Sequence, residues 1–214
     1  MTFLESVNSV LSRLRETSVT SVSATAYATQ IGQFINDAKR QVEDAWNWDA
    51  LYTVKTVTTS SGVSNYIVTG SGLSQKQVVV NDTTNDSQLI NKPRQWIIDL
   101  QDLSTVTNAN PSYYAWNGND GTDSKVELFP TPNGIYTLKF RMYIPQVVLS
   151  AGGDIILAPS EPIVLGAYAR ALVERGEDGG LSSSEAYALF KSSLADHVAL
   201  ESARFTENDC WVAV

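Results

Sequence analysis

The chain has 214 residues, 43% hydrophobic and 9% aromatic, so it can bury a core and is not a disordered protein. Fifteen Lys and Arg residues against 23 Asp and Glu residues give a net charge of −8, which argues against a sequence-reading nucleic-acid binder because such a protein needs a basic face. A single cysteine excludes an intrachain disulfide framework and favours a reducing folding environment.

The chain shows no targeting or membrane signal. Its first residues, MTFLESVNSVLSRLRE, lack a basic stretch followed by an apolar run, so we expect no secretion signal. No stretch approaches 18 apolar residues, and we therefore expect no membrane span.

Two helices are predicted at the start of the chain. The first opens with a capping box formed by Thr2 and Glu5 and ends near Glu16. The second runs from about residue 25 to 48. Its predicted apolar face consists of Ile31, Ile35, Ala38, Val42 and Ala45, and its predicted solvated face of Asp37, Lys39, Arg40, Glu43 and Asp44.

A change of period at residue 51 predicts β structure. The segments LYTVKTVTT, NYIVT and KQVVV are rich in β-branched residues and predict short strands. The stretch 70–123 is rich in Ser, Thr, Asn, Asp and Gly, and it contains the apolar islands QWIIDL and YYAW. We predict an irregular β region with long loops there.

The clearest strand pattern lies in VELFPTPNGIYTLKFRMYI. Asn133 and Gly134 suit a two-residue type I′ turn, which predicts a hairpin between the flanking strands. After this turn five apolar residues alternate with polar ones, so one face of the second strand is expected to be buried. These apolar residues are Tyr136, Leu138, Phe140, Met142 and Ile144.

Two further helices are predicted near the end of the chain. The first starts at Ser160, where Pro162 suits a first turn, and ends at a Gly176 cap; Gly166 and several alanines make it thin enough to pack closely against another helix. The second starts with a capping box at Ser182 and Glu185 and ends near residue 204. Its predicted apolar stripe consists of Leu189, Phe190, Leu194 and Val198.

This order of elements predicts an α+β fold, in which N- and C-terminal helices form a bundle that carries an inserted antiparallel β subdomain. The expected divisions are 1–50 for the first helices, 51–158 for the β-rich insertion, 159–204 for the last helices and 205–214 for an extended tail.

No catalytic constellation is apparent in the sequence. The single histidine, His197, lies beside Asp196 and four residues before Glu201, as a general base oriented by a carboxylate would. An exposed helical ion pair has the same pattern and is the interpretation we favour. No His or Cys cluster has metal-ligand spacing, so neither a metal site nor a cofactor is predicted.

Four other features of the sequence resemble chemical motifs but favour structural roles. The loop NGNDGTDSKVE resembles a calcium loop but has Gly121 and Leu128 where ligands are required, and TGSGLS lacks the Lys of a phosphate loop. A carboxylate cluster consists of Glu174, Glu177 and Asp178. Two carboxylates can hydrolyse a glycoside, but such a cluster at a helix end is more typical of a solvated turn. Cys210 has no His or Lys nearby to activate it.

Three segments, taken in order, resemble a known family. They are INDAKRQVEDAWNWDALY, VELFPTPNGIYTLKFRMYIPQVVLSAGGD and ILAPSEPIVLGAYARALVERGED. The resemblance covers about residues 25–178, plus the terminal helices by pattern. An aromatic-ended helix running into a strand, a "PTPNG-YTL" segment and a small-residue helix are similar to the head-to-tail adaptors, or connectors, of tailed bacteriophages, especially of short-tailed phages. Each motif is a structural signature rather than a catalytic one.

The resemblance implies a virion protein without enzymatic activity, located at the portal vertex and assembled in the host cytoplasm. It implies a ring, typically of twelve copies, that docks beneath the portal protein, extends the DNA channel without sequence-specific binding and carries tail or nozzle proteins. The apolar ending FTENDCWVAV suits contact with the portal or a neighbouring subunit. The expected contact residues are Phe205, Trp211, Val212 and Val214.

Other functions remain open at the sequence level. The chain could be another tail or neck component, such as a tail-tube or tail-completion protein, although four capped helices argue against a tube. It could be a wall-degrading enzyme with Glu174 or Glu201 as the acid. It could also be a carbohydrate-binding module that uses Trp96, Tyr113 and Trp116.

Overall fold

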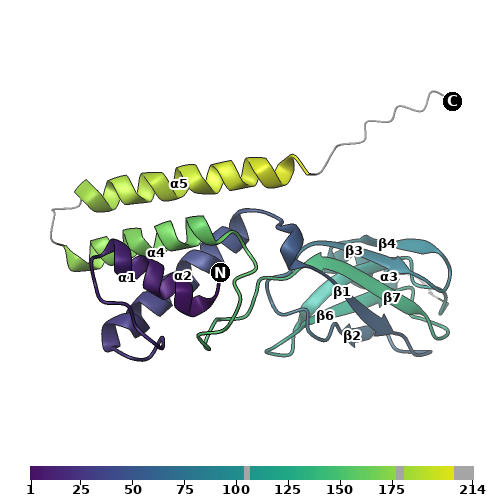
Figure 1. The fold of residues 1–214 in the computed structure, drawn as a ribbon. Helices are drawn as coiled ribbons and strands as arrows, with labels where there is room; N and C mark the ends of the chain where they lie inside the picture. The colour runs from purple at the N-terminus through teal and green to yellow at the C-terminus, as the bar shows by residue number, and fades with distance from the viewer. Residues whose placement is uncertain (104–106, 177–180, 205–214) are drawn as a thin grey trace, which may run out of the picture. The chain divides into compact units, whose positions relative to one another are not determined.

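The structure is a computed structural model that describes residues 1–103, 107–176 and 181–204 (Figure 1). The described residues form five α-helices and a seven-stranded mixed sheet, which confirms the predicted α+β class. They group into two compact units: a helical unit, formed by the described residues of 1–51 and 146–204, and a sheet unit, formed by those of 52–145.

The helical unit begins with α1 (Phe3–Arg13) and α2 (Ala26–Ala45). The predicted capping box is present in α1, where the Thr2 side chain accepts from the Glu5 amide and the Glu5 carboxylate accepts from the Thr2 amide. The apolar faces of both helices enter one core with the later helices. A 3-10 turn, η1 (Asp49–Leu51), follows α2.

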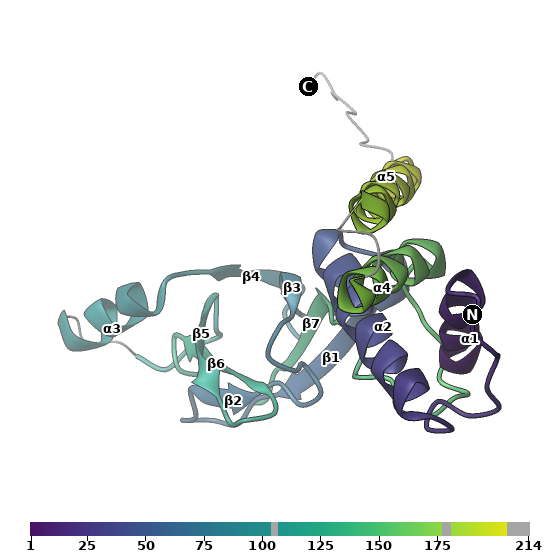
Figure 2. The same ribbon diagram turned by 90° about the vertical axis from the view of Figure 1, so that its left-hand side faces the viewer.

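The two C-terminal helices are α4 (Ser160–Arg175) and α5 (Leu181–Ser202). As Figure 2 shows, α4 lies between α5 and α2. Gly166 allows this close packing, because a Cβ added there would lie 3.1 Å from Phe190 and 3.2 Å from Ala38. Gly176 caps α4 in the left-handed conformation, as predicted (φ 64°).

Two details of α5 differ from the sequence prediction. The helix begins at Leu181, so Ser182 lies inside the first turn instead of at a cap position. Phe190 is fully buried and Leu194 and Val198 pack against the core, whereas Leu189 is exposed.

The sheet unit has the strand order β1-β7-β3-β4-β5-β6-β2. All its neighbouring strands are antiparallel except β4 and β5, so the prediction of a purely antiparallel subdomain is wrong at that pair. The strands are β1 (Tyr52–Thr58), β2 (Asn65–Ile67), β3 (Lys76–Asp82), β4 (Ser87–Asn91), β5 (Tyr113–Asn119), β6 (Ser124–Phe129) and β7 (Thr137–Tyr143).

The predicted hairpin around Asn133 and Gly134 is wrong. β6 pairs with β5 and β2, whereas β7 pairs with β1 and β3, and neither turn residue has a positive φ. Pro130 and Pro132 lack the amide N–H that a ladder needs. The predicted alternation in β7 is nevertheless confirmed, since Leu138, Phe140 and Met142 are fully buried.

A short helix, α3 (Arg94–Leu103), replaces the irregular β structure predicted around QWIIDL. Its Ile97 is fully buried, and Trp96 packs edge-on against Tyr113 and Phe129. The apolar residues at positions 96, 97 and 100 have helical spacing, but so short a segment is ambiguous in sequence.

The boundary of the sheet unit falls at residue 145. Residues 146–158, which the sequence prediction placed with the β-rich region, therefore group with the helices. The reason lies in hydrogen bonds that this segment makes to α2 and to the first residues of the chain.

Replacing Gly166 with leucine is expected to lower the free energy of unfolding by about 1–3 kcal/mol, because overpacking forces α4 away from α2 or α5. Chemical denaturation followed by circular dichroism measures this change. Val173→Leu adds bulk to an exposed position of the same helix and is the control. An unchanged unfolding free energy for Gly166→Leu would contradict the close packing of the three helices.

Candidate functional site

Residues 146–157 form a loop that we call the apolar hairpin. Its outgoing half is held by a buried ion pair on α2, in which Lys39 Nζ lies 3.3 Å from a Glu43 oxygen. Lys39 Nζ also donates to the carbonyls of Gln146 (2.7 Å) and Val147 (3.1 Å), and the Gln146 amide donates to Glu43 (3.3 Å). Two side chains of α2 thus bind the backbone of a segment that lies more than 100 residues later in the chain.

Both charges of this pair are removed from water, since the Lys39 side chain is 3% exposed and that of Glu43 is 0% exposed. Burial lowers the pKa of Lys39 and raises that of Glu43, and their mutual attraction opposes both shifts. The sequence prediction placed both residues on the solvated face of α2, which is wrong. The burial of Lys39 and Glu43 is indicated in the sequence by their spacing relative to Ile35, Ala38 and Val42. All five residues fall on neighbouring rows of the helix.

A second polar side chain of α2 fastens the same segment. Asn36 accepts from the Leu149 amide (2.9 Å) and donates to the Leu149 carbonyl (3.1 Å), while the Leu149 side chain is buried in the core. The following turn is closed by Asp154, whose carboxylate accepts from the amides of Ser150 (2.8 Å) and Ala151 (2.9 Å). These two bonds hold the pKa of Asp154 below its ordinary value.

The returning half is tied to the outgoing half and to the N-terminal residues. The Gln146 side chain donates to the Ile155 carbonyl (2.7 Å) and accepts from the Leu157 amide (3.2 Å). The Ile156 amide donates to the Met1 carbonyl (3.1 Å), and Thr2 forms an antiparallel bridge with Ile155. The backbone of the hairpin is thus fixed on both sides.

This fixed backbone presents large aliphatic side chains to solvent. Val147 is 82% exposed, Val148 73%, Ile155 61% and Leu157 48%. Single exposed apolar residues are ordinary, but four on one short, hydrogen-bonded hairpin mark a surface suited to contact with another protein. Because the loop is already ordered, little conformational entropy would be lost on binding.

A second surface is a groove on the helical unit that we call the helical groove. It has a volume of about 620 Å³ and lies between α2, α4 and α5. Its lining includes Phe34, Gln41, Ala169, Val173, Glu174 and Tyr187. The Arg170 guanidinium also lines it and is held by Gln41 (2.8 Å) and the Gly166 carbonyl (3.0 Å).

The candidate catalytic residues are placed in structural roles. His197 Nδ1 lies 2.8 Å from the Ser193 carbonyl, and its Nε2 lies 4.0 Å from Glu161 on α4. Glu201, the predicted partner of His197, instead accepts from the Asp49 amide (2.9 Å) and pairs with Arg204 (3.1 Å). The histidine and this carboxylate therefore do not form the pair considered from sequence.

Of the other acidic candidates, the structure describes Glu174 and Glu201 only. Glu174 lines the helical groove, while Glu177, Asp178 and Cys210 lie outside the described residues. Across the described ranges, no group of three or more His, Cys, Asp or Glu residues is arranged to hold a metal ion.

The calcium-like segment is the β5–β6 connection. The Asp123 carboxylate accepts from the amides of Gly70 (2.9 Å) and Gly72 (3.0 Å), and that of Asp120 accepts from its own turn. Both acidic groups thus bind backbone amides. The glycine-rich TGSGLS segment is the partner of this turn, and Gly70 and Gly72 both have positive φ angles.

The aromatic residues considered for carbohydrate binding do not form one platform. Trp96 and Tyr113 stack edge-on in a cluster with α3, with Lys92 over both rings. Trp116 packs against Tyr114 and Phe140, which belong to the other core of the sheet unit. Tyr113 and Trp116 are three residues apart on β5, so their side chains leave opposite faces of the strand.

The four tail residues predicted to contact a partner, Phe205, Trp211, Val212 and Val214, lie outside the described residues. Within the described helices, none is both long and apolar enough to cross a membrane.

Comparison with known proteins identifies one family. Residues 1–208 match the family model described as SU10 adaptor protein, which covers nearly the whole chain. No curated protein matches the chain at a significant level of similarity. The family match confirms the resemblance to phage head-to-tail adaptors, and this family is one of structural adaptors.

Replacing Lys39 with methionine is expected to lower the free energy of unfolding by about 3–5 kcal/mol, because the buried Glu43 carboxylate would lose the cation that compensates its charge. Denaturant titration measures the loss. Arg40→Met is the matched control: its ion pair with Asp44 is exposed on the same helix, and its removal should cost below about 1 kcal/mol. Equal effects of the two variants would contradict the role assigned to the buried pair.

Replacing Asp154 with alanine is expected to speed hydrogen exchange at the Ser150 and Ala151 amides at neutral pH. Because the folded pKa of Asp154 is lowered, its contribution is present above the ordinary value of 3.8 and is lost as pH falls through the folded pKa. The difference between wild type and variant should therefore shrink in acid. A difference that is independent of pH would show that the carboxylate charge is not responsible, and Asp44→Ala serves as control.

Proposed function

The chain belongs to the SU10 adaptor protein family, and on this premise we propose that it is a structural head-to-tail adaptor of a tailed phage. In this proposal it forms a ring, of about twelve copies if it follows the connectors that it resembles, beneath the portal protein at the neck of the virion. The ring extends the DNA channel and attaches tail or nozzle proteins. Assembly takes place in the host cytoplasm.

The observation that carries the proposal is the family match over residues 1–208. The order of elements supports it, since helices from both ends of the chain share one core while the intervening residues 52–145 form the sheet. We propose that this arrangement is a helical bundle with an inserted β subdomain. The apolar hairpin supplies a rigid surface of the kind that a structural assembly requires.

We propose that the tail, residues 205–214, contacts the portal or a neighbouring subunit through Phe205, Trp211, Val212 and Val214. Burying Trp211 contributes at most about 4–6 kcal/mol. Ordering ten residues costs on the order of 10 kcal/mol of backbone entropy. The tail must therefore add main-chain hydrogen bonds, for example by strand addition, and a ring multiplies the weak contact through effective concentration.

The net charge of −8 also suits a channel protein. A ring of negatively charged subunits repels the phosphates of passing DNA and so does not retain it. Genome DNA is accordingly expected to pass without sequence-specific binding.

The second candidate is another neck or tail component, such as a tail-completion protein. The family match supports an adaptor in general, and it fits both candidates. The head-to-tail adaptor and the tail-completion protein are therefore distinguished by the protein that each one binds. An enzyme or a carbohydrate-binding module is less well supported. Glu201 accepts from the Asp49 amide, and Trp96, Tyr113 and Trp116 pack against core clusters.

Electron microscopy of the purified protein mixed with its portal tests the proposal. We expect a closed ring on the portal and, for a variant truncated after Arg204, a folded protein that no longer binds. Full-length protein that binds tail components but not the portal would favour the tail-completion alternative. Unchanged portal binding by the truncated variant would refute the role of residues 205–214, but it would not contradict the proposed ring.

A further inference from the structure

The charges of the chain are divided unevenly between its two units. The sheet unit contains seven Lys or Arg and seven Asp or Glu residues, so it is neutral. The helical unit contains eight basic and 16 acidic residues and carries the whole net charge of −8. The two units therefore present different electrostatic surfaces to a neighbouring molecule.

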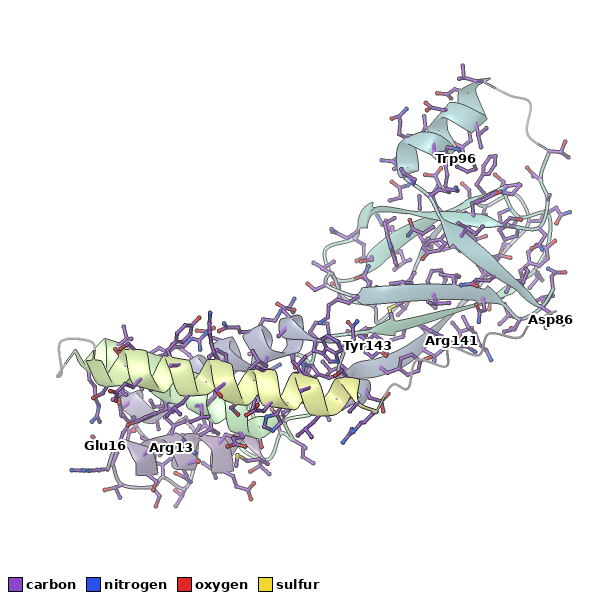
Figure 3. All side chains as sticks on the ribbon, turned by 90° about the horizontal axis from the view of Figure 1, so that it is seen from above. Arg13, Glu16, Asp86, Trp96, Arg141 and Tyr143 are labelled. Carbon is purple, nitrogen blue, oxygen red and sulfur yellow. The ribbon has the colours of Figure 1, made fainter. Side chains whose placement is uncertain are left out.

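One face of the sheet is basic, and we call it the basic face. On β7 the buried residues alternate with Lys139, Arg141 and Tyr143, which are partly exposed on the opposite side. The antiparallel register places Val54 and Val79 on either side of Arg141, and Thr56 and Asn81 on either side of Lys139. Figure 3 shows Arg141 and Tyr143 along this strand. Lys76 lies opposite Tyr143 on β3.

The described strands place no acidic residue on this face. β1, β3 and β7 contain one carboxylate, Asp82, which is buried and accepts from the amides of its own turn. Lys139 and Arg141 form no ion pair among the described residues. Arg141 reaches the side-chain oxygen of Asn81 (2.7 Å, with the Asn81 amide in its better-satisfied orientation), and this neutral partner leaves its charge uncompensated.

The basic face is also apolar, which favours a protein partner over DNA. Tyr52 is 44% exposed, Val54 43% and Val79 38%, and Tyr52 stacks edge-on with Tyr143 at 5.5 Å. Phosphate contacts need cations and hydrogen-bond donors but gain nothing from exposed valines. Tyrosine and arginine together are typical of the energetically dominant residues of protein interfaces.

The helical groove combines an apolar lining with exposed carboxylates. Its apolar lining includes Phe34, Val173 and Tyr187, and Glu174 also lines it. The one cation of the described lining, Arg170, donates to Gln41 and to the Gly166 carbonyl. Asp37 lies on the same row of α2 as Phe34 and Gln41, at helical spacing, and it is exposed. In the described part of the chain, neither carboxylate takes part in an ion pair.

We propose that the basic face of one copy docks on the helical groove of a second copy, with Lys139 and Arg141 facing Asp37 and Glu174. The apolar side chains around each pair of charges would then pack against one another. Because the two surfaces are different, the contact is head-to-tail, and repeating it closes a ring when the rotation between copies allows. The inference rests on the proposed ring and assigns the surfaces that join its subunits.

Charge reversal tests this pairing. Sedimentation at low salt should show self-association of the wild-type chain that weakens with added salt. Lys139→Glu with Arg141→Glu should weaken association about tenfold or more, and so should Asp37→Lys with Glu174→Lys, because each places like charges opposite one another. A mixture of the two variants, in which the reversed charges again match, should recover association.

The control is Lys125→Glu, which reverses a lysine of the same unit on β6 and should leave association unchanged. Circular dichroism establishes that every variant is folded. A wild-type chain that stays monomeric at low salt, or a mixture that does not recover, overturns the pairing. Binding to a short DNA duplex is measured as well. If DNA binding requires Lys139 and Arg141 and the copies do not associate, the basic face is a nucleic-acid surface and the proposed pairing of copies is wrong.

The portal experiment separates this inference from the proposed function. If the Lys139→Glu, Arg141→Glu variant still forms a ring on the portal, the subunit contact lies elsewhere and the adaptor role stands. If the wild-type chain forms no ring on the portal, the proposed function itself fails.

Discussion

The buried pair of Lys39 and Glu43 is the interaction on which the ordered surface of the helical unit depends. Desolvating two charges is costly, and the pair is retained only because both groups are also hydrogen-bonded to the backbone at residues 146 and 147. The same hydrogen bonds hold a loop whose aliphatic side chains face solvent. A polar contact inside the core thus supports an apolar surface outside it.

Close helix packing complements this contact. Gly166 lets α4 approach both α2 and α5, so a single thin helix joins the rest of the helical core. The helical groove arises from the same arrangement, because its lining comes from all three helices. Core and candidate interaction surfaces are therefore built from the same few elements, and a change in the packing of α4 would also alter the groove.

An adaptor of the kind proposed acts through the surfaces that it offers to neighbouring molecules. Its candidate catalytic side chains have structural partners: Glu201 holds the turn after α2, and His197 bonds to its own helix. Its distinctive features are instead the exposed aliphatic residues of the hairpin and the uneven distribution of charge between two units. Both features suit a role in which neighbouring molecules provide the apolar surfaces and the opposite charges that complete each contact.

The sequence by itself determined the local elements: the capping box at Thr2, the glycine cap at residue 176, the alternation in β7 and the thin helix around Gly166. These follow from short-range spacing and backbone preference. Only the tertiary structure decided that β6 and β7 do not pair, that QWIIDL is helical and that Lys39 and Glu43 are buried. Such outcomes depend on partners far away in the chain, and the spacing within one segment fits more than one of them.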